Sequence, residues 1–281
     1  MTVAQALREA ALALGSVSET SRLDAELLMA DAFGVTRSAL LLTCMNDLVP
    51  TGFAERIARR AAHEPIAYIT GWQEFWSLDL AVSPAVLIPR ADSETLIEAA
   101  LDALRDHPPQ RIIDLGTGSG ALLLAALTEW PDATGVGIDA STAALEIACA
   151  NAAALGLAGR AQMKAVDWRT PGWASACDGP FDLLLANPPY VETAAQLAPQ
   201  VKAHEPHSAL FAGDEGLDDY RILLPVLGDL LSADGIAIFE IGAAQRSAVS
   251  ALAQASGYTA ECRCDLAGHD RALILRKPCV S

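Results

Sequence analysis

The first 73 residues carry apolar side chains at the spacing of helical faces. Leu, Ala, Val and Ile recur every three or four positions in several runs, which places them on one side of a helix. Gly15 and Gly34 follow the first two runs, where glycine commonly ends a helix. The runs with this spacing cover residues 3–14, 23–32 and 53–62. No catalytic constellation falls here, so we predict a helical cap or docking domain over residues 1–73.

Residues 74–88 follow a different pattern. Phe75, Leu78 and Leu80 stand at the spacing of two short strands, which indicates a hairpin. Two prolines punctuate the connector near its end. We therefore predict that this segment links the helical domain to a second domain over residues 89–281.

From residue 111 onward, candidate strands alternate with helical segments. Strands joined by helical crossovers form a parallel sheet that is covered on both faces. Only a short loop over residues 265–271 separates the last two strands, so we predict that they pair antiparallel. The pattern predicts an α/β fold with a seven-stranded, doubly wound, Rossmann-like sheet, and this architecture resembles the methyltransferase variant of that fold. The candidate strands are residues 111–115, 134–139, 162–167, 181–186, 236–241, 259–264 and 272–276, and the clearest helices are residues 121–129 and 142–155.

Composition narrows the class of protein. The chain of 281 residues has a formal net charge of −16, which disfavours free nucleic acid as the main partner because phosphate binding needs a basic surface. No apolar run reaches membrane-spanning length, and charges at the N-terminus argue against a signal peptide. The six cysteines show no disulfide-framework spacing, and Cys262 and Cys264, two positions apart, fit two half-buried strand residues better than the alternative of a metal pair. We expect a cytoplasmic protein without a metal site or membrane association.

A glycine-rich segment connects the first strand of the predicted sheet to the helix after it. Its sequence lets the backbone turn tightly and approach a ligand closely. Asp139 ends the next strand, where a carboxylate can accept hydrogen bonds from both hydroxyls of a ribose. The segment predicts a nucleotide cofactor but does not distinguish NAD from S-adenosyl-L-methionine. Its candidate cofactor-binding residues are Asp114, Gly116, Thr117, Gly118, Ser119 and Gly120.

Two further features favour S-adenosyl-L-methionine. Asp114 stands at the entrance of the glycine segment, where it can accept an ammonium group but would repel a pyrophosphate. Asp167 and Trp168 end the third strand. The carboxylate can accept a hydrogen bond from an adenine amino group, and the indole can pack on the ring. Core packing is the alternative role for Trp168.

The fourth strand leads directly into Asn187, Pro188, Pro189 and Tyr190. Ligands of doubly wound sheets bind at the carboxyl ends of strands, so these four are candidate substrate-binding residues. The prolines fix the backbone, which leaves the Pro188 carbonyl and the Asn187 side-chain oxygen as rigid acceptors. Tyr190 adds a flat face and a hydroxyl. We predict catalytic roles for Asn187, Pro188 and Tyr190.

Such a slot suits the methylation of a planar, neutral NH2 group. The nitrogen of an amide or of a base amino group is a poor nucleophile, because its lone pair is delocalised. Two acceptors that hold both hydrogens can orient this nitrogen toward a methyl donor and favour the charge that develops on it. This chemistry requires no His, Cys or Ser nucleophile.

With these segments described, the chain resembles the glutamine methyltransferases of peptide chain release factors, the PrmC/HemK family. The resemblance extends from about His63 to Arg276. Asn-Pro-Pro-Tyr is shared with DNA adenine and RNA guanine methyltransferases, whereas the upstream segments are more specific. Besides the glycine segment and Gln245, the matching segments are HEPIAYITG at 63–71, EFW at 74–76, LIPR at 87–90, NPPY at 187–190, EP at 205–206 and FEIG at 239–242.

The resemblance implies methyl transfer from S-adenosyl-L-methionine to the side-chain amide nitrogen of a glutamine, in the GGQ motif of peptide chain release factors. It places the substrate amide at residues 187–190. Where the family usually reads Pro-Arg-Pro-Asp/Glu-Thr-Glu, this chain has Ala91 and Ser93. We expect these two residues to soften the loop without removing the site. The implied cofactor site comprises residues 116–120, Asp139, Trp168 and Asn187.

Three other functions are compatible with parts of the pattern. A nucleic-acid amino-group methyltransferase would need a basic groove and room for a flipped base, which the acidic composition disfavours. A non-catalytic nucleotide-binding module would use the Asn-Pro-Pro-Tyr segment only as structure. A dehydrogenase would bind NAD at the glycine segment.

Overall fold

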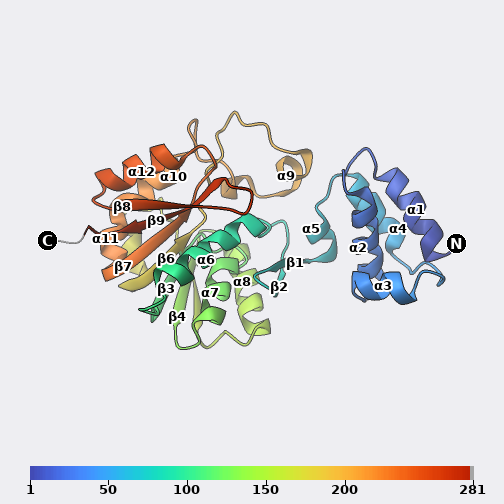
Figure 1. The fold of residues 1–281 in the computed structure, drawn as a ribbon, viewed down its shortest axis with the longest axis horizontal. Coiled ribbons are helices and arrows are strands. Elements are labelled where there is room, and N and C mark those ends of the chain that lie inside the picture. The colour runs from blue at the N-terminus through green and yellow to red at the C-terminus, as the bar shows by residue number, and fades with distance from the viewer. Residues whose placement is uncertain (279–281) are drawn as a thin grey trace. The chain divides into compact units, whose positions relative to one another are not determined.

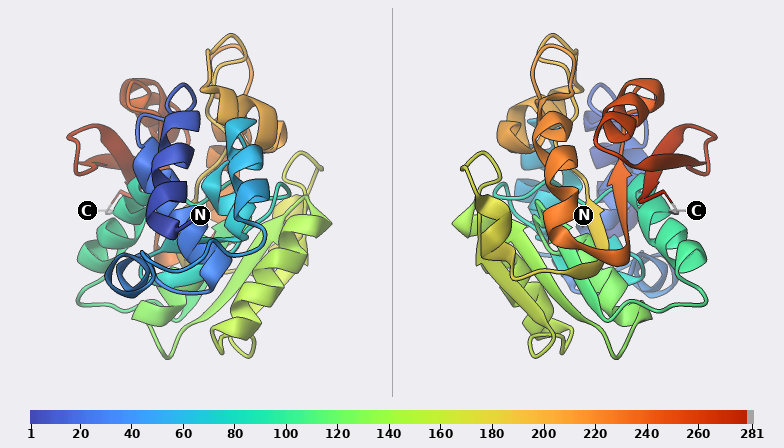
Figure 2. Two further views of the ribbon diagram at one scale, coloured as in Figure 1. Left: turned by 90° about the vertical axis from the view of Figure 1, so that its right-hand side faces the viewer. Right: turned by 90° about the vertical axis from the view of Figure 1, so that its left-hand side faces the viewer.

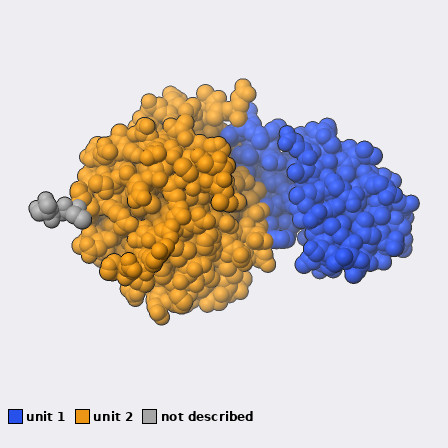
Figure 3. Space-filling model, in the orientation of Figure 1, with its two compact units in different colours: residues 1–72, 197–205 blue, residues 73–196, 206–281 orange. Residues whose placement is uncertain are grey.

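The computed structural model describes residues 1–278, and the chain divides into two compact units (Figure 3). The first unit contains residues 1–72 together with 197–205, and the second contains residues 73–196 and the chain from Pro206 onward. Each unit has a hydrophobic core of its own. Within residues 1–278, none of the helices combines the length and the apolar character that crossing a bilayer requires.

The first unit is a bundle of short helices, drawn in blue in Figure 3. The three helices predicted from apolar spacing are confirmed as α1, α2 and α4, with bounds that differ by one or two residues. The short helices α3, α5 and α9 are additions that the pattern did not predict. A buried ion pair crosses the core, since Arg60 Nε lies 2.7 Å from Asp24 Oδ2. The helices are α1 Val3–Ala13, α2 Ser21–Phe33, α3 Arg37–Thr43, α4 Phe53–Ala61, α5 Ile66–Thr70 and α9 Pro199–His204.

The predicted hairpin is present as β1 (Trp72–Phe75) and β2 (Leu78–Ala81). Trp76 and Ser77 form its turn with φ of 52° and 58°, the left-handed region that non-glycine residues seldom adopt. Hydrogen bonds hold Trp76 there: its backbone N–H donates to Glu94 Oε1 at 2.8 Å, and its indole N–H donates to a second glutamate.

The second unit contains a seven-stranded sheet in the order β5-β4-β3-β6-β7-β9-β8 (Figure 1). The strands β3 to β7 pair parallel, whereas β9 is antiparallel to both of its neighbours. The predicted fold, including the antiparallel last pair, is therefore confirmed. The strands are β3 Arg111–Leu115, β4 Thr134–Asp139, β5 Ala161–Ala165, β6 Phe181–Ala186, β7 Leu231–Glu240, β8 Thr259–Cys264 and β9 Asp270–Arg276.

Three predicted strands have different bounds in the structure, and for β9 the difference is only its start at Asp270, two residues before the predicted one. The strand β5 ends at Ala165, so Asp167 and Trp168 lie in the loop beyond it rather than at its last position. The strand β7 begins at Leu231, five residues before the predicted start. Ser232, Ala233 and Asp234 are not buried, so this part of the strand lacks the apolar run that marks the residues from Ile236 onward.

Helices cover both faces of this sheet (Figure 2). Because neighbouring residues of a strand point to opposite faces, Leu183 and Leu185 of β6 pack in one core with α6 and α7, while Leu184 and Ala186 pack in the other with α10 to α12. The helices are α6 Glu94–Ala103, α7 Ala121–Glu129, α8 Thr142–Ala154, α10 Asp218–Leu223, α11 Leu227–Leu230 and α12 Arg246–Ala255, with short 3₁₀ turns at Ala91–Ser93, Trp173–Cys177, His207–Ala209 and Leu224–Val226.

The register of the parallel strands brings the predicted site residues to one edge. Leu115 of β3 pairs with Ile138 of β4 and with Ala186 of β6. Ala186 in turn pairs with Phe239 of β7. The next residues along each strand therefore emerge side by side at the carboxyl edge, where ligands bind in this fold.

Candidate active site

The glycine loop wraps around the carboxyl end of β3. The backbone N–H groups of Gly116 and Thr117 both donate to the Ile138 carbonyl at 2.9 Å. Gly116, Gly118 and Gly120 have φ of 73°, 55° and 86°, which only glycine adopts without strain. A Cβ on Gly116 would also lie 3.0 Å from the Trp168 ring. The glycines are thus required by both conformation and close approach.

Asp114 is buried beneath this loop. Thr117 Oγ1 donates to Asp114 Oδ2 at 2.6 Å, and the side chain is fully enclosed apart from the cleft that it lines. Its other oxygen, Oδ1, is buried and has no hydrogen-bond partner in residues 1–278. Burial raises the pKa of the Asp114 carboxyl to about 7. An acceptor left open in this way fits a cationic donor from a ligand.

Asp139 stands at the end of β4, across from the loop. Its Oδ2 accepts from the Gly118 backbone N–H at 3.0 Å, and its Oδ1 accepts from Ser141 at 2.8 Å. These bonds fix the carboxylate in place, while burial raises its pKa. Ser141 also caps α8 by accepting from the Ala144 N–H. The carboxylate is held rigidly at the wall of the cleft.

Trp168 is oriented by a residue that sequence reasoning missed. Its indole Nε1 donates to Asp219 Oδ1 at 2.7 Å, and Arg169 donates to the same carboxylate at 2.9 Å. Asp219 is fully buried in α10. Asp167 accepts from the Arg169 backbone N–H at 2.8 Å. No spacing signal in the sequence connects Asp219 with Trp168, because 51 residues separate them.

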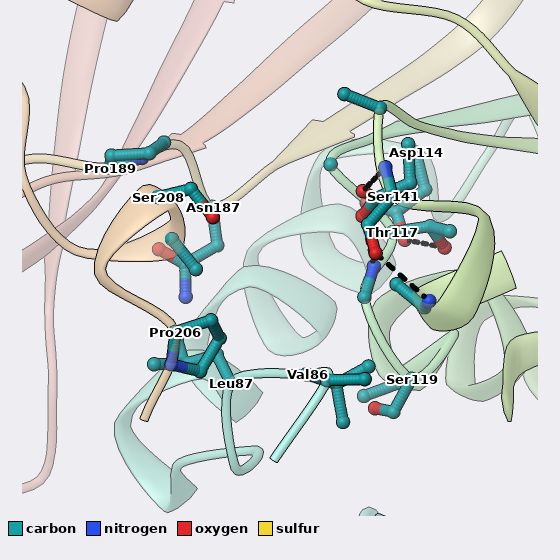
Figure 4. A pocket seen from close by; sticks show the side chains of 18 of the residues that line it. Val86, Leu87, Asp114, Thr117, Ser119, Ser141, Asn187, Pro189, Pro206 and Ser208 are labelled. Atoms are coloured by element: carbon teal, nitrogen blue, oxygen red, sulfur yellow. Dashed lines mark hydrogen bonds between the residues drawn. The ribbon is translucent and has the colours of Figure 1, made fainter. Parts of the chain in front are cut away.

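These groups line one cleft of about 540 Å³ in the second unit. In Figure 4, Asn187 and Pro189 lie on one side, while Asp114, Thr117 and Ser119 lie on the other. The wall also contains residues that were not predicted as site residues, among them residues 85–90, Ser93, residues 140–141 and 143–144 at the start of α8, and the turn around Pro206 and Ser208. The residues that were predicted and that line the cleft are Asp114, Gly116, Thr117, Gly118, Ser119, Asp139, Asp167, Trp168, Asn187 and Pro189.

Gly120, Pro188 and Tyr190 do not line this cleft. Gly120 is the N-cap of α7. Tyr190 is mostly buried, and its hydroxyl donates to Glu240 Oε1 at 3.1 Å. Burial and the negative charge of Glu240 raise the pKa of the Tyr190 hydroxyl. The structure therefore gives Tyr190 a carboxylate partner within the protein.

Gln245 fixes the backbone of the Asn-Pro-Pro-Tyr segment. Its Nε2 donates to the carbonyls of Tyr190 and Gly216, both at 3.1 Å. Its Oε1 accepts from the Gly242 backbone N–H at 3.0 Å. A Cβ on Gly216 would lie 2.2 Å from the Tyr190 carbonyl oxygen, so glycine is required there. The segment after β7 thereby holds the segment after β6.

Two family models match the chain. The model described as the PrmC N-terminal domain matches residues 5–71. The model described as a methyltransferase small domain matches residues 92–204. The second range includes the glycine loop and the Asn-Pro-Pro-Tyr segment.

Curated relatives match nearly the whole chain. A release factor glutamine methyltransferase of Moorella thermoacetica is 44% identical and covers 98% of this chain and 98% of its own length. A release factor glutamine methyltransferase of Bradyrhizobium diazoefficiens is 40% identical over 98% of this chain and 93% of its own length.

Solved structures with the same fold are more distant in sequence. A methyltransferase from Pyrococcus furiosus superposes with a TM-score of 0.53 at 16% identity and covers 80% of this chain and 98% of its own. A 16S rRNA methyltransferase from Thermus thermophilus, solved with S-adenosylmethionine and guanosine, has a TM-score of 0.51 at 17% identity, with 74% and 50% coverage.

A seven-stranded sheet with its last pair antiparallel, and a glycine loop facing an acceptor segment, define a Rossmann-like methyltransferase. Relatives that are about 40% identical over nearly the full length identify the family within this class of methyltransferases. The chain belongs to the family of release factor glutamine methyltransferases.

Proposed function

We propose that this enzyme methylates the side-chain amide nitrogen of a glutamine, in the GGQ motif of peptide chain release factors, with S-adenosyl-L-methionine as methyl donor. The observation that carries the proposal is the placement of Asn187 across one cleft from the glycine loop. The names of the full-length relatives support the choice of substrate.

The cleft fits the proposed cofactor. The buried Oδ1 of Asp114, which has no hydrogen-bond partner in residues 1–278, would accept a hydrogen bond from the ammonium group of the cofactor. Asp139 would accept from the ribose hydroxyls, and Asp167 and Trp168 would hold the adenine. Gly116 to Gly120 allow close approach of the backbone. Bound there, the cofactor supplies a methyl group on a positively charged sulfur.

The Asn-Pro-Pro-Tyr segment would bind the substrate amide. The Asn187 side-chain oxygen and the Pro188 carbonyl would each accept one hydrogen of the NH2 group, which fixes the plane of the amide. Acceptors at both hydrogens favour the positive charge that grows on nitrogen as the new bond forms. Pro189 would line the binding site of the amide directly. Tyr190, which does not line the cleft, would support the segment from within the protein.

The helical unit would select the protein substrate. It contains no catalytic constellation, and it matches the N-terminal domain model of this family. We therefore assign residues 1–73 to substrate docking, residues 74–88 to the linker and residues 89–281 to catalysis. Because release factors act in translation, we place the enzyme in the cytoplasm without stable nucleic-acid binding.

The test is incubation of the enzyme with radiolabelled S-adenosyl-L-methionine and a cell extract, with and without nuclease. A labelled protein band of release-factor size that survives nuclease supports the proposal. Label that disappears with nuclease would instead identify a nucleic-acid substrate and overturn it.

A further inference from the structure

The Asn187 amide can sit in the cleft in two orientations, which exchange its oxygen and its NH2 group. Under the proposed function, only the orientation that turns the oxygen toward the substrate provides an acceptor. The other orientation would set hydrogens against the hydrogens of the substrate amide. The protein therefore needs a device that selects one orientation.

A chain of hydrogen bonds runs from Asn187 to a buried carboxylate. Asn187 Nδ2 lies 3.3 Å from Ser93 Oγ, and Ser93 Oγ lies 2.5 Å from Glu240 Oε2. The other oxygen of Glu240 accepts from the Tyr190 hydroxyl. Glu240 is 1% exposed and Ser93, which borders the cleft, is 4% exposed, so both groups of this chain are largely removed from bulk water.

The direction of each bond follows from its donors. An ionised carboxylate only accepts, and a hydroxyl has a single proton. Ser93 gives its proton to Glu240, so toward Asn187 it can only accept. The bond to Ser93 therefore forms only when the NH2 group of Asn187 faces Ser93, which leaves the side-chain oxygen for the cleft.

The charge of Glu240 sets this direction. Burial and, to a smaller extent, the negative charge of Asp92 raise the pKa of the Glu240 carboxyl, while the hydrogen bonds from Ser93 and Tyr190 and the positive charge of Arg271 oppose that rise. Arg271 is itself anchored, since its Nη2 lies 3.2 Å from both Asp265 Oδ2 and Asp92 Oδ2. The cation favours the acceptor-only form of the carboxylate.

We propose that Glu240 and Ser93 are positioning residues that hold the Asn187 amide with its oxygen toward the substrate. This inference rests on the proposed function. Glu240 orients Tyr190 with its second oxygen at the same time. Both residues act through Asn187 and Tyr190, not on the substrate. The family's usual threonine at position 93 would keep the hydroxyl on which the device depends.

The kinetic test uses single-turnover methyl transfer to a purified release factor at saturating cofactor. Ser93→Ala should slow transfer about fivefold, because a neutral hydrogen bond no longer selects the orientation. Glu240→Gln should slow it at least tenfold, since its NH2 group can donate to Ser93 and reverse the chain. Ser93→Thr should stay within about twofold of wild type. Cofactor dissociation constants should change less than about threefold in all three.

Tyr220→Phe is the matched control. The Tyr220 hydroxyl donates to the backbone carbonyl of Glu240 at 2.6 Å, so its loss affects stability without changing the carboxylate. This variant should melt at a lower temperature and keep the wild-type rate. The inference is overturned if Ser93→Ala transfers at the wild-type rate, or if Tyr220→Phe slows transfer as much as Glu240→Gln. If Glu240→Gln does not fold, the comparison of Ser93→Ala with Ser93→Thr tests the inference.

A second readout needs no substrate. In a ¹⁵N NMR spectrum, the Asn187 side-chain NH2 signals are those missing from Asn187→Asp. In the wild type, one of the two Asn187 NH2 protons should be shifted downfield by its hydrogen bond to Ser93. The shift should be the same in Ser93→Thr and absent in Ser93→Ala. Identical shifts in wild type and Ser93→Ala would contradict the inference. If the spectra behave as expected but no release factor is methylated, the proposed function fails and the positioning role of Ser93 stands.

Discussion

At the scale of single residues, the cleft contains three carboxylates, those of Asp114, Asp139 and Asp167, in a largely apolar wall. Among the residues that the structure describes, the buried Oδ1 of Asp114 finds no hydrogen-bond partner, and burial raises the pKa values of Asp114 and Asp139. Such an arrangement costs folding free energy, because a buried polar group without a partner loses its hydration. A ligand that supplies the matching donors recovers this cost.

Asp114→Asn should therefore stabilise the free protein while weakening cofactor binding. The pKa of Asp114 is about 7 in the folded protein against 3.8 ordinarily, so the folded state holds an extra proton between these values. Its contribution to stability falls as pH rises through that window and is lowest above about 7. At pH 8 we expect a gain of roughly 1–3 kcal/mol in denaturant unfolding.

The same substitution should remove a pH dependence of binding. In the wild type, affinity for S-adenosyl-L-methionine should fall as pH drops from 7.5 to 5.5, because protonated Asp114 no longer attracts the ammonium group. Calorimetry on both proteins tests this. An equal pH dependence in Asp114→Asn would exclude Asp114 as the ammonium acceptor.

Asn187 allows a comparison of two substitutions. Asn187→Ala removes one of the two orienting acceptors and should cost roughly 2–4 kcal/mol in the transition state. Asn187→Asp keeps an acceptor and should retain more activity than the alanine variant. Cofactor affinity should stay within about tenfold in both. A wild-type single-turnover rate for Asn187→Ala would contradict a catalytic role for Asn187 and leave it only the structural role of ending β6.

At the scale of elements, the site depends on the register of β3, β4, β6 and β7. Level strand ends place the glycine loop, Asp139, Asn187 and Glu240 along one edge. Close packing supports the loop from below, since a Cβ on Gly137 would lie 2.8 Å from both Met163 Sδ and Thr117 Oγ1. The glycine in β4 thus leaves room for a loop residue.

Gly137→Ala should displace Thr117 and disturb the loop. Overpacking of this kind costs about 1–3 kcal/mol of stability, and cofactor affinity should fall several-fold as the loop shifts. Melting temperature and calorimetry measure the two effects. Gly159→Ala is the matched control, because nothing lies within 4 Å of its added Cβ. Equal behaviour of the two variants would contradict the packing account.

Local patterning predicted the strands and the longer helices, but neither the short helices α3, α5 and α9 nor the contacts between distant elements. Apolar periodicity found all seven strands and the hairpin, since these depend on nearby residues. The bond from Ser93 to Glu240 joins residues 147 positions apart, and no local signal encodes it. Asp219 and the wall around Pro206 were missed for the same reason. The Phe-Glu-Ile-Gly segment at 239–242 contributes to the family resemblance, but its sequence does not reveal the role of Glu240, which depends on partners that are distant in sequence.

At the scale of the whole molecule, the division into two units separates the cleft from the helical unit to which we assign substrate docking. All residues that line the cleft belong to the second unit. The first unit includes residues 197–205 as well as the N-terminal helices, and His204 Nε2 lies 3.4 Å from the Ala62 carbonyl oxygen. A segment that follows the substrate slot in sequence is therefore part of the helical unit.

Removal of the first unit should spare cofactor binding and abolish methylation of the protein. Deleting residues 1–70 would strip α9 of its partners, so residues 197–205 should be replaced by a Gly-Ser linker in the same variant. Calorimetry should give a cofactor dissociation constant within about threefold of wild type, with a cooperative melt as the control for folding. Full activity of this variant on a release factor would contradict a docking role.

The most direct test of the central claim is mass spectrometry of a purified release factor after incubation with this enzyme and S-adenosyl-L-methionine. We predict one added methyl group, located on the side-chain nitrogen of the GGQ glutamine, and no methylation when that glutamine is replaced by alanine. A methyl group on another residue, or unmodified release factor alongside a methylated nucleic acid, would contradict the account.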